Sequence, residues 1–415
     1  MAVTAVQLPG SGTTHSKPTV QGCANCRRDQ EFLRETVRPD YEGLAPRLRV
    51  VDLFCGCGGL SLGLAEAARR YGLGFEVSLA VDNDAAATHV YARNFPGANV
   101  IRASVEDKFD GQLDKRLTRR ELALRRAIGM VDVLVGGPPC QGHSNLNNHT
   151  RRDDDRNGLY ARMARAARVL EPSVVLIENV PTVQHDMNGV LGTTLDTLDA
   201  LGYAVEERVV DLSMIGVPQR RKRHVLVAVM DVDIDPLEVF DSLTCPCERH
   251  PTRTVKWAIE DLIHAKTDGI YDSASILSPA NAERIAYLFR EGLYDLPNSL
   301  RPDCHQSDHT YKSMYGRLRW GQPAQTITTG FCSPGQGRYV HPSRQRTLTP
   351  HEACRLQMLP DFFDFSDCVT RKSVKRMIGN LVPPTLGIAI GRLVLPAVIP
   401  MAKPHSRSAR RQGRL

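Results

Sequence analysis

The chain predicts an α/β fold in which a parallel sheet is covered by helices on both faces and is followed by a smaller, irregular domain. Short β-branched runs alternate with helical segments from Leu48 to about Asp231, which is typical of strand–helix–strand units. Residues 236–340 lose this alternation and mix short apolar runs with Pro, Gly, His and charged residues. Ligands of such sheets bind beyond the carboxyl ends of the strands, and the informative motifs of this chain all lie there.

Each element of the first domain follows from its apolar pattern. Leu48–Phe54 predicts a strand, and a glycine-rich turn leads into a helix over Leu60–Tyr71. Phe75–Val81 predicts a second strand, followed by a helix from about Asp84 to Asn94. The other predicted elements are strands at Val131–Val135, Val174–Ile177 and His224–Val229, helices at Leu159–Leu170 and Thr349–Met358, and an apolar stretch, Val382–Val398, that packs back on the sheet.

Composition places the chain among soluble globular proteins, with room for two domains in its 415 residues. It has no run of about 18 apolar residues and no signal peptide, and its eleven cysteines are scattered. We therefore expect a cytoplasmic protein without a membrane span or a disulfide scaffold. Basic clusters at 151–152, at 220–223 and in the tail 401–415 contribute to a net charge of +7, and such patches suit phosphate backbones.

One cysteine lies in a loop suited to chemistry. The segment Gly136-Gly137-Pro138-Pro139-Cys140-Gln141-Gly142 follows the predicted strand Val131–Val135. The prolines stiffen this loop and the glycines leave room for a flat substrate, so Cys140 is a candidate nucleophile. Most cysteines are small buried core residues, and the flanking Pro-Pro and Gly weigh against that alternative here.

A glycine-rich turn predicts a nucleotide-like ligand. Asp52-Leu53-Phe54-Cys55-Gly56-Cys57-Gly58-Gly59-Leu60 connects the first strand to its helix, so a ligand can lie against bare backbone while Phe54 offers a face for a purine. Ser61 replaces a glycine of the nicotinamide dinucleotide fingerprint, so that spacing fails. Asp82 ends the second strand, where carboxylates commonly bind ribose hydroxyls. Capping of a helix by Asp82 or Asp84 is the alternative.

A carboxyl group and an arginine run complete the candidate site. Glu178-Asn179-Val180 follows the strand Val174–Ile177, and burial favours the protonated form of a carboxyl, which suits proton donation. Within Gln219-Arg220-Arg221-Lys222-Arg223, alternate arginines can point to a polar ligand and leave others for phosphates. The alternatives are a glutamate bonded to nearby backbone and an ordinary solvated charge run.

Zinc binding has only weak support in the sequence. Cys23 and Cys26 could form half of a site, with Cys245, Cys247 and His250 supplying the rest. The Cys-x-Cys spacing is poor for a zinc knuckle and the two pieces are far apart in the chain. We therefore predict no metal and leave these cysteines as an open question.

Together, the motifs resemble those of the DNA (cytosine-5)-methyltransferases, in that family's usual order. DLFCGCGGL resembles the cofactor loop, GGPPCQG the catalytic loop, ENV the acid motif and VPQRRKR the arginine motif. RTLTPHEACRLQMLP, from Arg346 to Pro360, and IGNLVPP, from Ile378 to Pro384, resemble the last two motifs. The resemblance covers roughly Leu48–Val229 and Thr326–Val398. It implies a Rossmann-like S-adenosylmethionine-dependent methyltransferase sheet with a smaller target recognition domain.

This resemblance implies a division of the chain and a role for each motif residue. Residues 1–45 would be a flexible lead-in, 46–235 the catalytic domain, 236–340 the target recognition domain, 341–400 the C-terminal motifs that pack back on the catalytic domain, and 401–415 a basic tail. S-adenosylmethionine would be the methyl donor. Its expected contacts are Phe54 on adenine, Asp82 on ribose, Gly56, Gly58 and Gly59 along the methionine part, and Leu159 and Asn380.

The implied substrate is a cytosine swung out of double-stranded DNA. Cys140 would attack C6, Glu178 would donate to N3, Arg223 would bond O2 and Arg221 would support the site. The polar stretch 141–158 would close over the flipped base. The residues expected to contact DNA are Gln141, Ser144, Arg151 and Arg152 in that stretch, and Thr326. The enzyme would act as a monomer, with a cognate restriction nuclease or defence system as a possible partner.

The chain departs from the family pattern at two places, and other functions stay open. His143 stands where Phe is usual, and Ala103-Ser104-Val105 stands where an acidic residue is expected, so adenine recognition would rest on Ser104 or backbone. A transfer RNA cytosine-5 methyltransferase is the main alternative, disfavoured because Gly142-His143-Ser144 replaces Pro-Phe-Thr. A non-catalytic DNA-binding relative and a nicotinamide oxidoreductase are the others.

Overall fold

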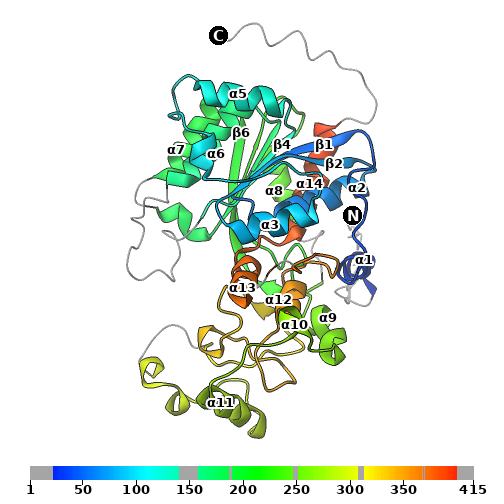
Figure 1. The fold of residues 1–415 in the computed structure, drawn as a ribbon, viewed down its shortest axis with the longest axis vertical. Helices are drawn as coiled ribbons and strands as arrows, with labels where there is room; N and C mark the ends of the chain where they lie inside the picture. The colour runs from blue at the N-terminus through cyan, green and yellow to red at the C-terminus, as the bar shows by residue number, and fades with distance from the viewer. Residues whose placement is uncertain are drawn as a thin grey trace, which may run out of the picture.

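A seven-stranded sheet forms the centre of the larger part of the molecule, in the order β3-β2-β1-β4-β5-β8-β6 (Figure 1). The computed structural model describes residues 22–139, 158–186, 189–245, 251–306, 313–366, 368 and 370–399. The strands of the sheet are β1 (Arg47–Leu53), β2 (Gly74–Asp82), β3 (Val100–Arg102), β4 (Val133–Gly136), β5 (Val174–Asn179), β6 (Ala204–Asp211) and β8 (Lys222–Val229).

The strands from β1 to β5 are parallel, whereas β8 runs antiparallel between β5 and β6. The prediction of a parallel sheet is therefore confirmed for β1 to β5 and wrong for the run His224–Val229. The reason is the length of the connection. Residues 212–221, which join β6 to β8, are too few for the crossover helix that a parallel pair requires. Within them, β7 (Gln219–Arg220) pairs with β9 (Ala324–Gln325).

Helices cover both faces of the sheet. On β1, Val50 belongs to one apolar core and its neighbour Val51 to the other, because successive strand side chains point to opposite faces. The first core includes residues of α2, α8 and α14, and the second includes residues of α6. The helices of this part are α1 (Ala24–Leu33), α2 (Gly59–Arg70), α3 (Ala85–Asn94), α4 (Val105–Lys108), α5 (Arg119–Ile128), α6 (Gly158–Leu170), α7 (Val190–Ala200), α8 (Pro236–Thr244) and α14 (Pro384–Val398), with the 3-10 helix η3 (Pro181–His185).

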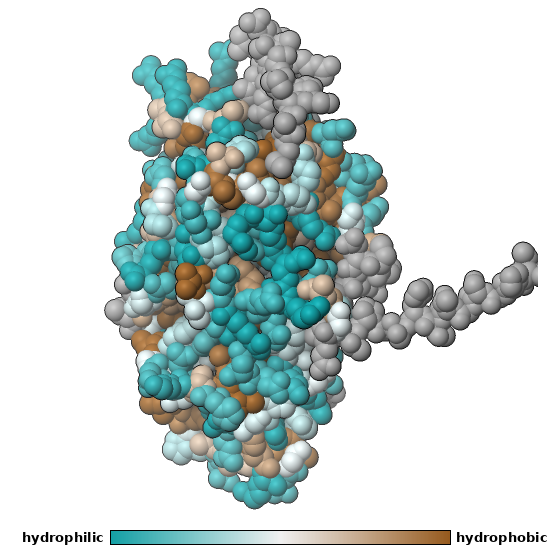
Figure 2. Space-filling model, turned by 90° about the vertical axis from the view of Figure 1, so that its right-hand side faces the viewer, coloured by the Kyte–Doolittle hydropathy of each residue, from teal (hydrophilic) through white to brown (hydrophobic). Residues whose placement is uncertain are grey.

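The apolar C-terminal stretch packs back on the larger part, as predicted. Helix α14 lies against α2 at glycines of both helices, and a Cβ on Gly63 would lie 2.1 Å from the Pro384 carbonyl oxygen. The segment Arg371–Val398 is long and apolar enough to cross a membrane, but 61% of its most apolar window is buried in the protein. Burial against α2 therefore explains why the segment Arg371–Val398 is apolar. On the surface, Figure 2 shows hydrophilic side chains predominating across the middle of one face of the molecule.

The smaller part lies beside the carboxyl-end side of the sheet and contains little regular structure (Figure 1). It has its own small apolar cluster, formed by Leu288, Leu296, Met314 and Tyr315. Helix α8 contacts β6 and α14 and so belongs with the larger part; the domain boundaries at 235 and 340 stay predictions. The remaining elements are α9 (Val255–Ile259), η5 (Glu260–His264), α10 (Gly269–Asp272), α11 (Pro279–Arg290), η6 (Asn298–Leu300), η7 (Asp303–His305), η8 (Pro334–Gln336), α12 (Pro350–Leu356) and α13 (Arg371–Asn380).

Candidate active site

The turn after β1 combines one open glycine with two closely packed ones. Gly56 has φ 53° and nothing lies within 4 Å of the position of a Cβ, so this residue borders open space. At Gly58, with φ 96°, a Cβ would lie 2.7 Å from a ring carbon of Phe95, and at Gly59 it would lie 2.2 Å from the Val382 carbonyl oxygen. Gly56 is therefore free to border a ligand, whereas Gly58 and Gly59 allow the turn to pack on α3 and on the loop before α14.

Asp82 fastens this turn to the end of β2. Its carboxylate accepts hydrogen bonds from the Gly56 backbone N–H at 2.9 Å and from the Asp84 N–H at 2.9 Å. Burial raises the pKa of Asp82, and these backbone donors partly oppose that shift. Asp84, not Asp82, caps α3, since its side chain accepts from the Ala86 and Ala87 N–H groups. Asp82 thus shapes the wall in which a ribose is expected.

A buried acid beneath the turn was not identified from the sequence. Asp52 Oδ2 accepts a hydrogen bond from the Ser61 hydroxyl at 2.7 Å, and Tyr91 donates to Ser61 at 2.7 Å. Burial raises the pKa of Asp52 to about 7, although both hydroxyls lower it. The serine that breaks the dinucleotide fingerprint therefore binds Asp52. The available signal was one acid inside the apolar strand, between Val51 and Leu53.

The loop after β4 approaches the acid motif. A Cβ on Gly136 would lie 2.6 Å from Met163 Sδ of α6. At Gly137 it would lie 3.5 Å from Glu178 Oε2 and 3.7 Å from Val382 Cγ2, which leaves room for a close approach there. The residues that the structure describes are interrupted after Pro139 and resume at Gly158. The predicted residues Cys140, Gln141, Ser144, Arg151 and Arg152, and the departure at His143, lie outside the described residues.

Glu178 and Arg223, predicted from separate motifs, lie together at the ends of β5 and β8. Arg223 Nε is 2.8 Å from Glu178 Oε1, and both side chains are largely buried. The geometry is that of an ion pair without hydrogen-bond alignment, and within the described residues Oε1 accepts no hydrogen bond. The described partner of Glu178 is thus a side chain rather than nearby backbone. The carboxyl is held in place and keeps capacity to bind a substrate.

Arg221 has a different environment from Arg223. It is 2% exposed, and its two Nη atoms donate to the carbonyl oxygens of Ile327 and Leu381, each at 3.0 Å. The Ile327 carbonyl belongs to the segment that follows β9, and the Leu381 carbonyl belongs to the loop before α14. Arg221 therefore joins three segments behind the site, and it supports the site by position.

Two buried glutamines that the sequence did not single out connect the same segments. Gln219 Nε2 donates to Gln357 Oε1 at 2.7 Å, and Gln219 Oε1 accepts from the Ile327 N–H at 3.0 Å. Gln357 Nε2 donates to the Ile378 carbonyl oxygen at 2.7 Å. Gln357, which follows α12, is thereby linked through Gln219 to β7 and to the segment after β9, and directly to α13. Because the partners are far apart in the sequence, no local motif reveals these contacts.

The other predicted contacts are Thr326, Leu159 and Asn380, and Thr326 lies beside Arg223. The Thr326 hydroxyl donates to the Arg220 carbonyl oxygen at 2.7 Å, and Thr326 borders a hollow of about 590 Å³ together with Arg223 and Lys222. Leu159 is half-buried at the start of α6, and Asn380 is exposed at the end of α13. The structure therefore places Thr326 beside Arg223.

No metal centre emerges from the part of the chain that the structure describes. There, no group of three or more His, Cys, Asp or Glu side chains could hold an ion. Cys23 instead caps α1, where its Sγ accepts from the Cys26 N–H at 3.4 Å. Cys245 is disulfide-bonded and so is not available as a zinc thiolate, whereas Cys247 and His250 lie outside the described residues. Ser104 caps α4 by accepting from the Glu106 N–H at 3.3 Å.

The sheet order, the glycine turn after β1 and the cluster at the strand ends define an α/β methyltransferase. The chain belongs to the C-5 cytosine-specific DNA methylase family, whose sequence profile matches residues 48–395. The Type II methyltransferase M1.BsuMI of Bacillus subtilis is 41% identical over 92% of this chain and 90% of its own length. The Type II methylase M.HgiDII of Herpetosiphon aurantiacus is 33% identical over 83% of this chain and 94% of its own.

Solved structures agree with this assignment. A DNA modification methyltransferase encoded within an E. coli prophage superimposes with a TM-score of 0.60 at 26% identity, over 85% of this chain and 99% of that one. The S. pombe Dnmt2 methyltransferase gives a TM-score of 0.56 at 17% identity, over 84% of this chain and 99% of that one. The second likeness supports the fold alone. The family and fold predictions are confirmed, and the chain is a DNA cytosine-5-methyltransferase.

Proposed function

We propose that the enzyme transfers the methyl group of S-adenosylmethionine to C5 of a cytosine flipped out of duplex DNA, through a covalent bond between Cys140 and C6. The observation that carries this proposal is the Glu178–Arg223 pair, 2.8 Å apart. It stands beside Gly137, at the start of the loop that leads to Cys140. An acid and a guanidinium at the start of the loop that leads to a cysteine suit addition of a thiolate to a pyrimidine ring.

The residues around the glycine turn fit the expected methyl donor. Gly56 borders open space in a left-handed conformation, so a ligand can approach its backbone without meeting a side chain. Asp82, which shapes the wall of the turn, would bind the ribose hydroxyls, and half-buried Phe54 would cover the adenine. Asn380 and Leu159 would complete the contacts. When bound, S-adenosylmethionine supplies an electrophilic methyl group.

The chain's own residues would prepare the cytosine ring. The Cys140 thiolate bonds to C6, and the displaced electron pair makes C5 nucleophilic while Glu178 supplies a proton at N3. Arg223 donates to O2 and holds the carboxyl group in place. After C5 has been methylated, its hydrogen leaves as a proton to solvent and the freed electron pair forms the C5–C6 double bond. The thiolate leaves C6 with the electron pair of the sulfur–carbon bond, and the proton at N3 returns to Glu178. Arg221 touches no substrate in this scheme.

Contacts with DNA would come from both parts of the molecule. Flipping one base out of a duplex costs a few kcal/mol, which phosphate contacts by Arg151, Arg152, Ser144, Gln141 and Thr326 would offset. The proposed recognition domain, within 236–340, would read the target in the major groove. The relatives' names support a role in a type II restriction–modification system. We propose a cytoplasmic enzyme that acts as a monomer, with a cognate nuclease as partner.

The test is methyl transfer from labelled S-adenosylmethionine to separate DNA and RNA, followed by bisulfite sequencing of DNA from cells that express the protein. We expect label in duplex DNA only, at one sequence word. Cys140→Ser should abolish transfer and keep DNA binding. Cys304→Ser removes an exposed cysteine and is the matched control. Full activity of Cys140→Ser, or label in RNA alone, would refute the proposal.

A further inference from the structure

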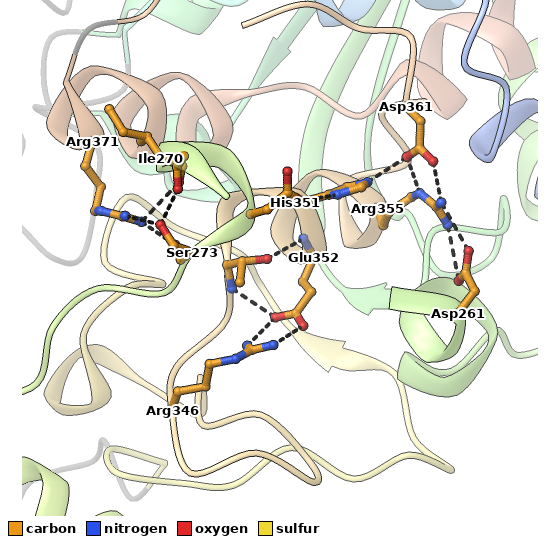
Figure 3. A network of polar contacts seen from close by, with 12 residues as sticks. Asp261, Ile270, Ser273, Arg346, His351, Glu352, Arg355, Asp361 and Arg371 are labelled. Atoms are coloured by element: carbon orange, nitrogen blue, oxygen red, sulfur yellow. Dashed lines mark hydrogen bonds and ion pairs between the residues drawn. The ribbon is translucent and has the colours of Figure 1, made fainter. Parts of the chain in front are cut away.

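His351 occupies an unusual position at the junction of the two parts of the molecule. Its Nδ1 lies 2.7 Å from Asp272 of α10, and its Nε2 lies 2.8 Å from Asp361, which follows α12. The ring is largely buried and stacks on Tyr271, with centroids 4.9 Å apart. Figure 3 shows the contact with Asp361 and its continuation through Arg355 to Asp261.

The two short contacts determine the protonation state of the ring. A neutral imidazole has one N–H donor and one acceptor nitrogen, whereas a carboxylate only accepts. Two carboxylates at hydrogen-bond distance from both nitrogens therefore require a second N–H, that is, an imidazolium. A neutral ring would point a lone pair at one carboxylate and lose that bond.

The surrounding charges also call for a cation at this position. Asp272 on α10, Asp361 after α12 and Asp261 on η5 face the cluster, and the paired guanidinium groups come from Arg355 on α12 and Arg34 beyond α1. A protonated ring would bring the cations to the same number as the carboxylates. Burial lowers the pKa of His351, but the hydrogen bonds and charges of the two aspartates outweigh burial and raise it overall.

Other charged and titratable groups lie near the ring, and a hollow beside it is lined by His264, Arg344, Arg346 and Glu352. On α12, Glu352 is bonded by Arg346 and by the Thr349 N–H. The pKa of Cys354 is raised by burial, as is that of Tyr271. From α13, Arg371 donates to carbonyl oxygens of the residues around α10, at Ile270 and Ser273 (Figure 3).

The cluster joins segments that serve the candidate site. Arg355 also donates to the Ala258 carbonyl oxygen of α9, and the Asp361 N–H donates to the Leu33 carbonyl oxygen of α1. The residues after α12 connect to β7 through the Gln219–Gln357 hydrogen bond. A Cβ on Gly379 of α13 would lie 2.2 Å from the Thr329 backbone nitrogen, close to Thr326. Loosening α10 would therefore disturb the segment around Thr326, where the contact with DNA is proposed.

We propose that His351 is a positioning residue whose protonated ring clamps α10 to α12, and that the enzyme binds DNA more tightly while this ring is protonated. The effect on DNA rests on the proposed function; the clamp itself does not. Because the folded state raises the pKa of His351, its stabilising contribution is complete below the unfolded value of about 6.5. It is lost as the pH rises through the folded value.

The first test uses the full chain and needs no methyl transfer. Histidine ring resonances, followed by NMR against pH, should show His351 titrating above the ordinary value for a histidine. His351→Gln assigns the resonance. Asp272→Asn removes one carboxylate and should lower the His351 pKa. If His351 titrates at or below the ordinary value in the wild-type chain, the clamp is refuted even if the enzyme methylates DNA as proposed.

The second test separates KM from kcat. Losing one hydrogen bond to a charged group corresponds to about tenfold or more in an equilibrium constant. We therefore expect KM for DNA to rise about tenfold as the pH passes the His351 pKa, with little change in kcat. Asp272→Asn should shift that rise to lower pH, and His264→Gln should leave it in place. An unshifted rise in Asp272→Asn would overturn the role in DNA affinity.

Discussion

Replacing each of two arginines in one motif by lysine separates structural support from chemistry. Arg221 is buried with two 3.0 Å hydrogen bonds to carbonyl oxygens, whereas Arg223 pairs with Glu178 at the site. Lysine keeps the positive charge, but its single ammonium reaches one of the two carbonyls at most. Arg221→Lys therefore loses at least one charge-assisted hydrogen bond, about 1.5–3 kcal/mol, and leaves a buried carbonyl unsatisfied for about 1–3 kcal/mol more. We expect a loss of about 2.5–6 kcal/mol.

Arg223→Lys should behave in the opposite way. Its ion pair with Glu178 keeps both charges in a looser form, so we expect a smaller loss of stability than in Arg221→Lys. The planar fork that would meet the substrate is lost, and the single-turnover rate should fall about 100-fold or more. Each variant is the control for the other, because the same arginine-to-lysine change is made at two positions that are two residues apart.

Urea unfolding followed by two probes measures the stability difference. The two tryptophans, Trp257 and Trp320, report on the segments around α9 and before β9, whereas far-UV circular dichroism reports on the whole chain. In Arg221→Lys, the fluorescence transition should move to lower urea and precede the dichroism transition. Equal losses of stability in both variants, or unchanged stability in Arg221→Lys, would refute the distinction between a supporting and a site arginine.

Three further predictions concern the glycine turn, the buried acid and DNA binding. Gly59→Ala should weaken S-adenosylmethionine binding in equilibrium dialysis and lower the melting temperature, because its Cβ would lie 2.2 Å from the Val382 carbonyl oxygen. Gly192→Ala is the control, because nothing lies within 4 Å of the position of a Cβ at Gly192. Normal cofactor affinity of Gly59→Ala would contradict the packing argument. Burial raises the pKa of Asp52 from 3.8 to about 7, so its contribution to stability is complete below 3.8 and is lost as the pH rises through 7. Asp52→Asn should flatten that part of the stability curve, and an unchanged slope would be evidence against a buried proton. DNA affinity should fall steeply between 50 and 200 mM salt, roughly in proportion to the number of phosphates bound, and a flat response in fluorescence anisotropy would contradict phosphate contacts.

The helices and strands that were predicted correctly from the sequence are those that pack against apolar residues in the core. Strands β1, β2, β4 and β5 and helices α2, α3 and α6 are found within a few residues of their predicted bounds, because burial on both faces leaves a continuous apolar run. The short edge strand β3 was not predicted. Strand β6 was missed because it lies at the sheet edge and carries Glu206, Glu207 and Arg208. The direction of β8 was wrong because an apolar run gives no information about strand polarity.

The site was predictable where one motif suffices and hidden where partners come from distant segments. Glu178 and Arg223 each follow from a local pattern, and the sheet brings them within 2.8 Å. The partners of Arg221 are carbonyl oxygens 106 and 160 positions away, and no side-chain pattern marks a carbonyl. His351 was passed over for the same reason, since Asp272 comes from the irregular part of the chain.

The most direct test of the proposed chemistry is trapping of the covalent intermediate. Duplex DNA carrying 5-fluorocytosine at the target position cannot lose a proton from C5, so the bond between sulfur and C6 should persist once the methyl group has been transferred. With S-adenosylmethionine present, we expect a stable protein–DNA adduct that peptide mass spectrometry places on Cys140 and that Cys140→Ser does not form. No adduct, or an adduct on another residue, would contradict nucleophilic attack by Cys140.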